Sequence, residues 1–337
     1  MTGSEFTVVS MMRETRSVAA RFIEYYLKLG ASRIEIFFDG DPTPVAHLAS
    51  EKVRIHPCDE NLWRQFGVAR PGSVEKRQWH IALNAFRAIE TDWMLHVDAD
   101  EFVFADQPMR NLLSAVPDDV EVLRLPTAEA VWCPSDSNED AFTSTGFRTA
   151  LPSHLSKLRR VIYPLHHGLF SPQGIIGHVQ GKIFIRKGTQ VDALTCHNAL
   201  RKGQKIGSWA SDLGPTFQSL HLGHFDAVSF DHWQTKWRRR TAGESIYITL
   251  SKTRLRQMQT IERALHGKPS GALRMFRKLY RLSPIQFAIL RSLGCAFRRD
   301  IFAEMGMNDS AICKASAAAR TQLVPDYSAN PTKNESI

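Results

Sequence analysis

The sequence has 337 residues, a mass of 38.1 kDa and a formal net charge of +9. Hydrophobic residues make up 43% and charged residues 23% of it, which is ordinary for a globular protein and excludes a disordered, collagen-like or coiled-coil chain. No apolar run reaches the ~18 residues of a membrane-spanning helix, and the first residues lack a secretory signal pattern, so the expected location is the cytoplasm.

Helix and strand patterns alternate in the first third of the chain. Apolar side chains recur every three or four residues over 16–29, which predicts an amphipathic helix, and a β-rich run follows at 34–38. A shorter strand at 52–56, a helix with an apolar stripe over 79–89 and an apolar strand at 93–97 continue the pattern. This β-α-β order predicts an α/β fold with a mostly parallel sheet flanked by helices.

Two of these strands end in acidic residues. Asp39 follows the strand at 34–38, and Asp98 follows the strand at 93–97. Ligands bind at the carboxyl ends of the strands in open parallel sheets, so both positions are candidate binding sites. Asp39 also begins an Asp-Gly-Asp-Pro run, which a plain turn would explain.

The second strand end carries three carboxylates within four residues, Asp98, Asp100 and Glu101. Carboxylates this close repel one another unless a cation lies among them. Oxygen ligands suit Mg²⁺ or Mn²⁺, which commonly complete their coordination with phosphate oxygens and water, so the motif predicts a metal-bound diphosphate. A solvated acidic loop is the alternative, because Asp-x-Asp spacing by itself is common.

Basic residues concentrate in a later segment of the chain. Residues 234–300 contain 16 Lys and Arg against three acidic residues, a segmental charge of +13. Apolar residues recur at helical spacing over 255–265 and 285–297, and Ser283 before a proline predicts a helix start. This segment is expected to be basic and helical, and the polar residues 325–337 are expected to form a disordered tail.

Several motifs resemble, in the same order, those of bacterial family 2-like glycosyltransferases with the GT-A fold. Asp98-Ala99-Asp100-Glu101-Phe102, preceded by Trp93, is similar to the acidic block of that family. Gly181-Lys182 before an apolar strand, and the segment 222–230 around His224, are similar to two later blocks. Further matches are Arg13-Glu14, Glu24-Tyr25-Tyr26, Leu29-Gly30, Asp39 and Gln78–Asn84.

The sequence departs from the family pattern at three positions. Phe225 stands in place of a Tyr, Val228 in place of a Lys, and Arg13 in place of an Asn. The resemblance covers roughly residues 6–240. It implies a GT-A-like glycosyltransferase domain at 1–240, followed by a basic helical extension at 241–324.

The resemblance implies a metal-dependent transfer of a sugar from a UDP- or GDP-sugar to a glycan, a lipid-linked acceptor or another hydroxyl, with inversion. The metal, Mn²⁺ or Mg²⁺, would neutralise the departing diphosphate, and its implied ligands are Asp98, Asp100 and His224. Asp98 alternatively faces the donor ribose. The implied nucleotide-sugar-binding residues are Arg13, Asp39, Asp98, Lys182 and Arg238.

An inverting transferase also needs a carboxylate that deprotonates the acceptor hydroxyl. Four residues are candidates for this general base, and the sequence does not choose among them: Asp136, Glu139, Asp140 and Asp226. The loops at 132–150 and 164–181 are the expected acceptor-binding segments.

Three other functions fit parts of the sequence. A metal-dependent phosphohydrolase or nucleotidyltransferase would use the same carboxylates. A nucleic-acid-binding protein would use the positive charge of 234–300, but no nucleic-acid-binding motif accompanies it, so nucleic acid is the weaker alternative. Basic helices within 252–300 would also fit a peripheral contact with an anionic membrane, which is compatible with a lipid-linked acceptor.

Overall fold

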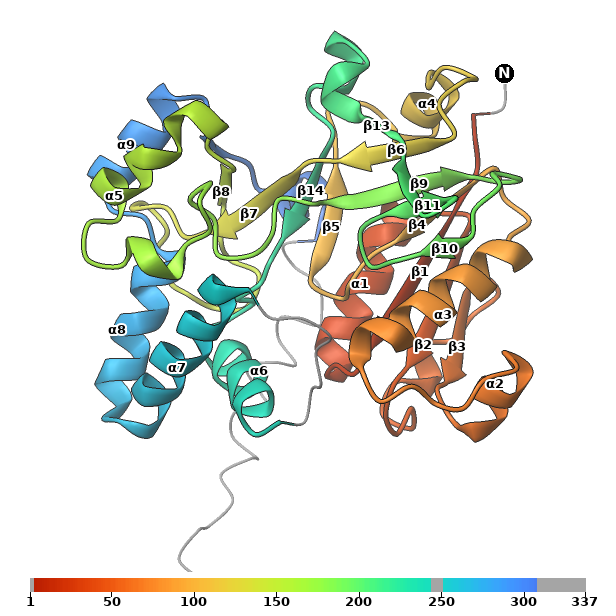
Figure 1. Ribbon diagram of the computed structural model, residues 1–337, viewed down its shortest axis with the longest axis horizontal. Helices are drawn as coiled ribbons and strands as arrows, with labels where there is room; N and C mark the ends of the chain where they lie inside the picture. The colour runs from red at the N-terminus through yellow and green to blue at the C-terminus, as the bar shows by residue number, and fades with distance from the viewer. Residues whose placement is uncertain (1–2, 244–250, 308–337) are drawn as a thin grey trace, which may run out of the picture.

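The computed structural model describes residues 3–243 and 251–307, and a seven-stranded sheet in the order β13-β6-β9-β4-β1-β2-β3 forms its centre (Figure 1). Strands β4, β1, β2 and β3 run parallel, and β9 lies antiparallel between β4 and β6. The predicted α/β class with a mostly parallel sheet is confirmed. The strands are β1 (Phe6–Met12), β2 (Arg33–Phe38), β3 (Val53–Pro57), β4 (Trp93–His96), β6 (Val122–Leu125), β9 (Lys182–Arg186) and β13 (Ser208–Trp209).

Helices cover both faces of this sheet. Neighbouring residues of β1 point to opposite faces, so Phe6 packs in one core with α1 while Val9 packs in another with α2 and α3. Thr15 caps α1 and Ser73 caps α3 by accepting backbone N–H groups, and α3 therefore begins before the predicted stripe at 79–89. These helices are α1 (Arg16–Lys28), α2 (Glu60–Gln65) and α3 (Val74–Ala88), with α4 (Met109–Ser114) following β5.

A second sheet has five strands in the order β15-β8-β7-β14-β5. Strand β5 (Glu101–Phe104) follows β4 after the turn at 97–100, so the acidic motif joins the two sheets. Strand β14 (His221–His224) pairs with β5 and β7, which places His224 opposite both Glu101 and Glu129. The remaining strands are β7 (Thr127–Val131), β8 (Gly146–Thr149) and β15 (Ala296–Arg298), with β10 (Ala193–Leu194), β11 (Ala199–Arg201) and β12 (Gln204–Ile206) in a small antiparallel sheet.

The basic helices pack against the second sheet. Trp132, Trp233 and Phe276 belong to one buried cluster, and β15 adds a strand beside β8, so the helical region shares a core with the segment after β7. The predicted helix start at Ser283 is confirmed, since its side chain accepts the backbone N–H of Gln286. The helices are α5 (Arg159–Ile162), α6 (Phe230–Thr241), α7 (Lys252–His266), α8 (Pro269–Tyr280), α9 (Pro284–Ser292) and α10 (Ile301–Glu304).

Two further predictions concern the tail and the membrane. The predicted tail at 325–337, together with 308–324 of the predicted extension, lies outside the described residues. Within 3–243 and 251–307, no helix is long and apolar enough to cross a membrane.

Candidate active site

Three predicted nucleotide-binding residues lie along one edge of the parallel sheet. Arg13, Asp39 and Asp98 come just after β1, β2 and β4, and the backbone N–H of Asp39 donates to the last carbonyl of β1 (2.8 Å). The carboxylate of Asp39 is engaged there by Arg70 (2.7 Å) and Arg77 (3.1 Å). The carboxyl ends of these adjacent parallel strands therefore bring together residues that are distant in the sequence.

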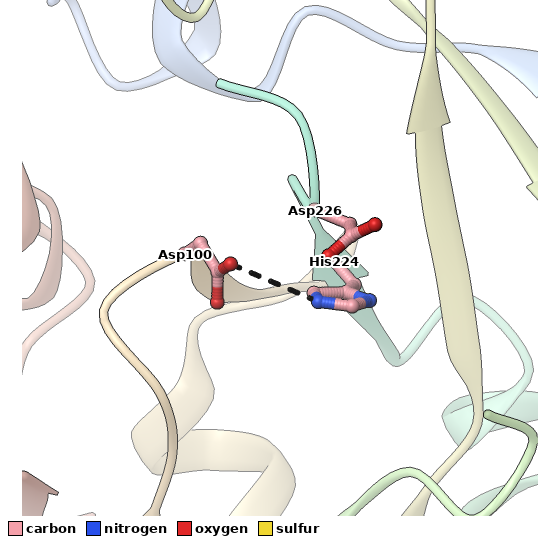
Figure 2. Close-up of side chains that lie close together, drawn as sticks. All are labelled: Asp100, His224 and Asp226. Carbon is pink, nitrogen blue, oxygen red and sulfur yellow. Dashed lines mark ion pairs between the residues drawn. The ribbon is translucent and has the colours of Figure 1, made fainter. Parts of the chain in front are cut away.

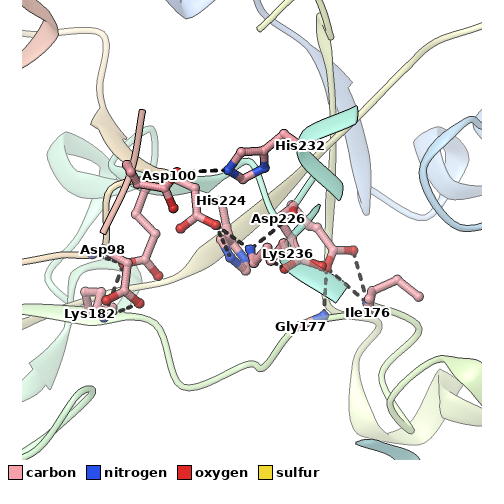
Figure 3. A network of polar contacts seen from close by, with 12 residues as sticks. Asp98, Asp100, Ile176, Gly177, Lys182, His224, Asp226, His232 and Lys236 are labelled. Atoms are coloured by element: carbon pink, nitrogen blue, oxygen red, sulfur yellow. Dashed lines mark hydrogen bonds and ion pairs between the residues drawn. The ribbon is translucent and has the colours of Figure 1, made fainter. Parts of the chain in front are cut away.

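Asp98 is held by side chains from two other elements. One of its carboxylate oxygens accepts a hydrogen bond from Gln78 Nε2 of α3 (2.6 Å). The other accepts one from Lys182 Nζ of β9 (3.0 Å) (Figure 3). The same ammonium lies 3.2 Å from Glu101, which also accepts the backbone N–H of Asp98 (2.8 Å). Burial alone would raise the pKa of Asp98, but the charge of Lys182 outweighs burial and holds this pKa below its usual range.

Lys182 is fully buried at the start of β9. The preceding Gly181 has a φ of +63°, and a Cβ at this position would lie 1.8 Å from the carbonyl oxygen of Leu125. The glycine of the Gly-Lys motif is therefore needed for a close backbone contact between β9 and β6. The ammonium of Lys182 faces Asp98 and Glu101, and its contact with a donor diphosphate stays a prediction.

Glu101 and three histidines surround the buried side of the acidic motif. Burial raises the pKa of Glu101 to about 7. Burial lowers the pKa of His96 to about 3 and that of His197 to about 4, so both imidazoles are neutral near pH 7. The ring centroids of His178 and His197 are 3.8 Å apart, and burial also lowers the pKa of His178. The positive charge next to Asp98 and Glu101 is therefore supplied by Lys182 and not by these imidazoles.

Asp100, His224 and Asp226 come together between the two sheets (Figure 2). One ligand atom of each lies within 4.8 Å of the others, and His224 Nε2 is 3.9 Å from the Asp100 carboxylate. The backbone N–H of Phe225 donates to the carbonyl of Asp100 (2.8 Å), which fixes the end of β14 against the acidic motif. Two predicted metal ligands thus share this group. Asp98 is not part of it, whereas Asp226, predicted only as a general-base candidate, is.

Lys236 of α6 bridges the two carboxylates of this group. Its Nζ lies 2.6 Å from Asp100 and 2.8 Å from Asp226 (Figure 3). The hydroxyl of Tyr280 donates to Oδ2 of Asp226. Arg240 lies 3.9 Å from Oδ1, the oxygen that Lys236 contacts. Burial would raise the pKa of both carboxyl groups, but the nearby ammonium of Lys236 lowers both. Asp100 and Asp226 are therefore ionised.

The chemistry of the donor set fits a hard divalent cation. Two ionised carboxylates and one imidazole nitrogen are ligands that Mg²⁺ and Mn²⁺ accept. His224 turns Nε2 toward Asp100, so this nitrogen is the one positioned for coordination. A divalent cation at this place would compete with the Lys236 ammonium for the same two carboxylates.

Glu129, which the sequence analysis did not single out, holds the chain segment beside His224. It is fully buried and accepts hydrogen bonds from Arg148 Nε (2.7 Å) and from the backbone N–H of Gly177 (2.7 Å). A Cβ on Gly177 would lie 3.2 Å from His224 Nδ1, so this segment packs directly on the imidazole. The available sequence signal was a single acid within the otherwise uncharged strand at 127–131, which indicates a buried ion pair.

Arg13 and Arg238 have exposed side chains near α6. The carbonyl of Arg13 accepts a hydrogen bond from Arg239 (3.5 Å), and His232 lies 3.1 Å from Glu14. These contacts join the first turns beyond β1 to α6. The phosphate contacts predicted for Arg13 and Arg238 stay predictions.

The remaining general-base candidates have local partners. Asp136 accepts the backbone N–H of Cys133 (2.7 Å) and so closes a turn, and Glu139 pairs with Arg281 (3.0 Å). Asp140 is exposed. None of the three belongs to the group formed by Asp100, His224 and Asp226, and their catalytic role stays a prediction.

No model of a known protein family matches the chain, and no curated protein matches its sequence. Solved structures with some likeness include a mycobacterial protein, at 16% identity over 55% of this chain and 54% of that chain, with a TM-score of 0.29. Residues 1–349 of TarS from S. aureus are 12% identical over 54% of this chain and 47% of that chain, with a TM-score of 0.29. A 4-diphosphocytidyl-2C-methyl-D-erythritol synthase from Anaerococcus prevotii is 8% identical over 55% of this chain and 71% of that chain, with a TM-score of 0.27. The chain spans about half the length of the first two.

Proposed function

We propose that this protein is a metal-dependent glycosyltransferase that moves a sugar from a nucleoside diphosphate sugar to a hydroxyl acceptor. The observation that carries the proposal is the meeting of Asp100, after β4, with His224 and Asp226 at the end of β14. Asp100 lies beyond the carboxyl end of a strand of the parallel sheet, and together with a carboxylate and an imidazole from the second sheet it can hold a cation where a diphosphate binds. Asp100 and His224 belong to the two blocks that resemble family 2-like glycosyltransferases.

The nucleoside of a UDP- or GDP-sugar is proposed to lie along the edge formed by Arg13, Asp39 and Asp98. The side chain of Asp98 is 33% exposed, so it can accept a hydrogen bond from a ribose hydroxyl as well as those from its protein partners. Asp39 is oriented by two arginines and offers a second acceptor. Arg238, exposed on α6, is proposed to contact the phosphates.

Mn²⁺ or Mg²⁺ would be held by Asp100, His224 and Asp226, with Asp98 as a further predicted ligand. A bound ion of this kind supplies the positive charge that stabilises the departing nucleoside diphosphate. The contribution of Lys236 is to keep both carboxylates ionised, because its ammonium favours their charged forms.

The acceptor is proposed to be a glycan or a lipid-linked hydroxyl that reaches the site along the segment at 164–181. Support comes from Glu129, which fixes Gly177 of this segment directly against the imidazole of His224. Asp226, Asp136, Glu139 and Asp140 are retained as candidates for the general base.

The test is a panel of UDP- and GDP-sugars with the purified protein and Mn²⁺ or Mg²⁺. We expect at least one donor to yield its free nucleoside diphosphate. Asp100→Asn and His224→Gln should each reduce turnover by more than about 100-fold, since even partners that only orient a metal ligand are worth 10–100-fold. Matched controls are Asp118→Asn and His154→Gln, both at exposed positions, which should keep full turnover.

Two outcomes would refute the proposal. One is that no donor is bound or turned over, or that the Asp100 and His224 variants keep their turnover while folded. The other is release of phosphate or pyrophosphate in place of the nucleoside diphosphate, which would make the protein a phosphohydrolase or a nucleotidyltransferase.

A further inference from the structure

A groove of about 800 Å³ shares no lining residue with the group formed by Asp100, His224 and Asp226. It is formed by α8, the first turn of α9 and the turn that follows α5, which gather on the side of the molecule away from α2 and α3 (Figure 1). The residues used below are Leu165, Arg274, Arg277, Lys278, Arg281 and Pro284, all of which line it. We call this surface the basic groove.

Apart from Pro134, the residues that line the basic groove come from two segments without any acidic residue. Residues 141–191 contain no Asp or Glu, and neither do residues 263–299. Arg274 and Lys278 are exposed on α8, one helical turn apart, and so present their charges on the same face. Within the described part of the chain, no acidic residue lines the groove.

An acidic residue does lie at one end of the groove. Glu139 contacts Arg277 (2.9 Å) and Arg281 (3.0 Å), so these two guanidinium groups already have a carboxylate partner. The positive charge that remains available to a ligand therefore lies mainly at Arg274 and Lys278, with Arg160 of α5 also exposed.

Large aliphatic side chains on the same elements are exposed to water: Leu165 lines the groove, Ile285 lies between two residues that line it, and Val161 lies in α5. Val161 is 67% exposed, Leu165 83% and Ile285 73%, and these are the three most exposed large hydrophobic residues in the described ranges. Gln286 Nε2 donates to the carbonyl of Ile162 (2.9 Å), which ties the first turn of α9 to α5. Val161 lies in α5, Leu165 in the turn that follows α5, and Ile285 in the first turn of α9. We call these three side chains the aliphatic rim.

We propose that the basic groove and its aliphatic rim dock the protein on the surface of an anionic lipid bilayer. Anionic headgroups complement the exposed cations, and the interfacial region of the bilayer accepts short aliphatic side chains next to them. A soluble acidic glycan would satisfy the cations but leave Leu165 and Ile285 in water. A symmetric contact between two copies would place the same basic surface against itself. The proposal does not depend on the transferase activity.

The test is co-sedimentation of the full chain with vesicles of phosphatidylcholine alone or phosphatidylcholine mixed with phosphatidylglycerol. We expect binding to the mixed vesicles only, and we expect high salt to weaken it because exposed charges are screened. The double variant Arg274→Glu with Lys278→Glu should lower the partition coefficient by roughly tenfold or more, since each basic residue near an anionic surface contributes about a fivefold effect.

A second double variant, Leu165→Ser with Ile285→Ser, tests the aliphatic rim and changes no charge. It should also weaken binding to the mixed vesicles severalfold. The matched control is Lys52→Glu with Lys205→Glu, which makes the same charge change at exposed positions in other parts of the fold and should leave most of the binding intact. All these side chains are exposed, so thermal melts should show unchanged folding.

Four results would overturn the proposal. Equal binding to both vesicle types would show that the anionic headgroups do not contribute to binding. Binding to the mixed vesicles that survives Leu165→Ser with Ile285→Ser unchanged would show that the aliphatic side chains take no part in docking, and binding that survives Arg274→Glu with Lys278→Glu unchanged would place the contact on another surface. A dimer in light scattering that this variant dissociates, without any vesicle binding, would assign the surface to contact between copies of the chain.

Discussion

The ammonium of Lys236 lies 2.6 Å from the carboxylate of Asp100, although 136 positions separate the two residues in the sequence. This contact joins α6 to the turn between β4 and β5, and the same ammonium reaches Asp226 at 2.8 Å. The carboxylates of Asp100 and Asp226 therefore already have a positive partner within the chain. Any divalent ion that binds to them must displace this ammonium or share the carboxylates with it.

Replacing Lys236 by methionine separates its role as a counter-ion of the two carboxylates from its competition with a divalent ion. Lys236→Met leaves Asp100 and Asp226 without their shared counter-ion, so the free energy of unfolding should fall by roughly 3 kcal/mol in chelator. The affinity for Mn²⁺ should rise, because the ammonium no longer competes for the carboxylates. Urea unfolding and isothermal titration calorimetry measure the two quantities. Lys205→Met, at an exposed position of β12, is the control, and an unchanged Mn²⁺ affinity in Lys236→Met would show that the ion binds elsewhere.

Asp226 has two candidate roles that one variant distinguishes. If Asp226 is a metal ligand, as its place beside Asp100 and His224 suggests, Asp226→Asn should weaken Mn²⁺ binding by more than about tenfold. If Asp226 is only the general base, the same variant should keep the Mn²⁺ affinity and lose kcat. Calorimetry with Mn²⁺ alone, followed by donor turnover at saturating Mn²⁺, separates the two results.

The buried pair of Glu129 and Arg148 should be important for stability. The two side chains are 0% and 1% exposed, and Glu129→Gln would leave the guanidinium buried without its counter-charge, at a cost of about 3 kcal/mol. The matched control is Glu121→Gln, because the Glu121–Arg201 pair is also close, at 2.7 Å, but is 42% and 36% exposed. That change should cost less than about 1 kcal/mol. Equal losses in urea unfolding would contradict this account.

The buried imidazole of His96 predicts a pH dependence of stability. Burial lowers its pKa from 6.5 to about 3, so below pH 6.5 the unfolded chain takes up a proton that the folded protein does not. The stability that the neutral, buried imidazole provides is fully present above pH 6.5 and is lost as the pH falls toward 3. In His96→Met the slope of unfolding free energy against pH should be smaller by about 1.4 kcal/mol per pH unit between pH 6 and 4. Parallel curves for the two proteins would show that His96 is protonated in the folded state.

Local sequence patterns were sufficient for the elements that carry the acidic motif. The predicted helix at 16–29 and strand at 93–97 agree with α1 and β4, because an apolar stripe and a short apolar run each depend only on neighbouring residues. The start of α9 at Ser283 was predictable for the same reason, since a cap bonds to its own first turn. The predicted apolar stripe begins at Trp79, whereas α3 begins at Val74, directly after its cap residue Ser73.

The chain by itself therefore determined an α/β fold and placed Asp98, Asp100 and His224 in blocks that indicate a site. Only the tertiary structure decided that Asp226, Lys236 and Tyr280 meet Asp100, and that Glu129 holds the segment beside His224. The physical reason is that these residues meet through long-range contacts. Strand β14 pairs with β5 and β7, and α6 and α8 pack over the ends of these strands. Periodicity and spacing record which face of an element is buried, but not which distant side chain lies against it.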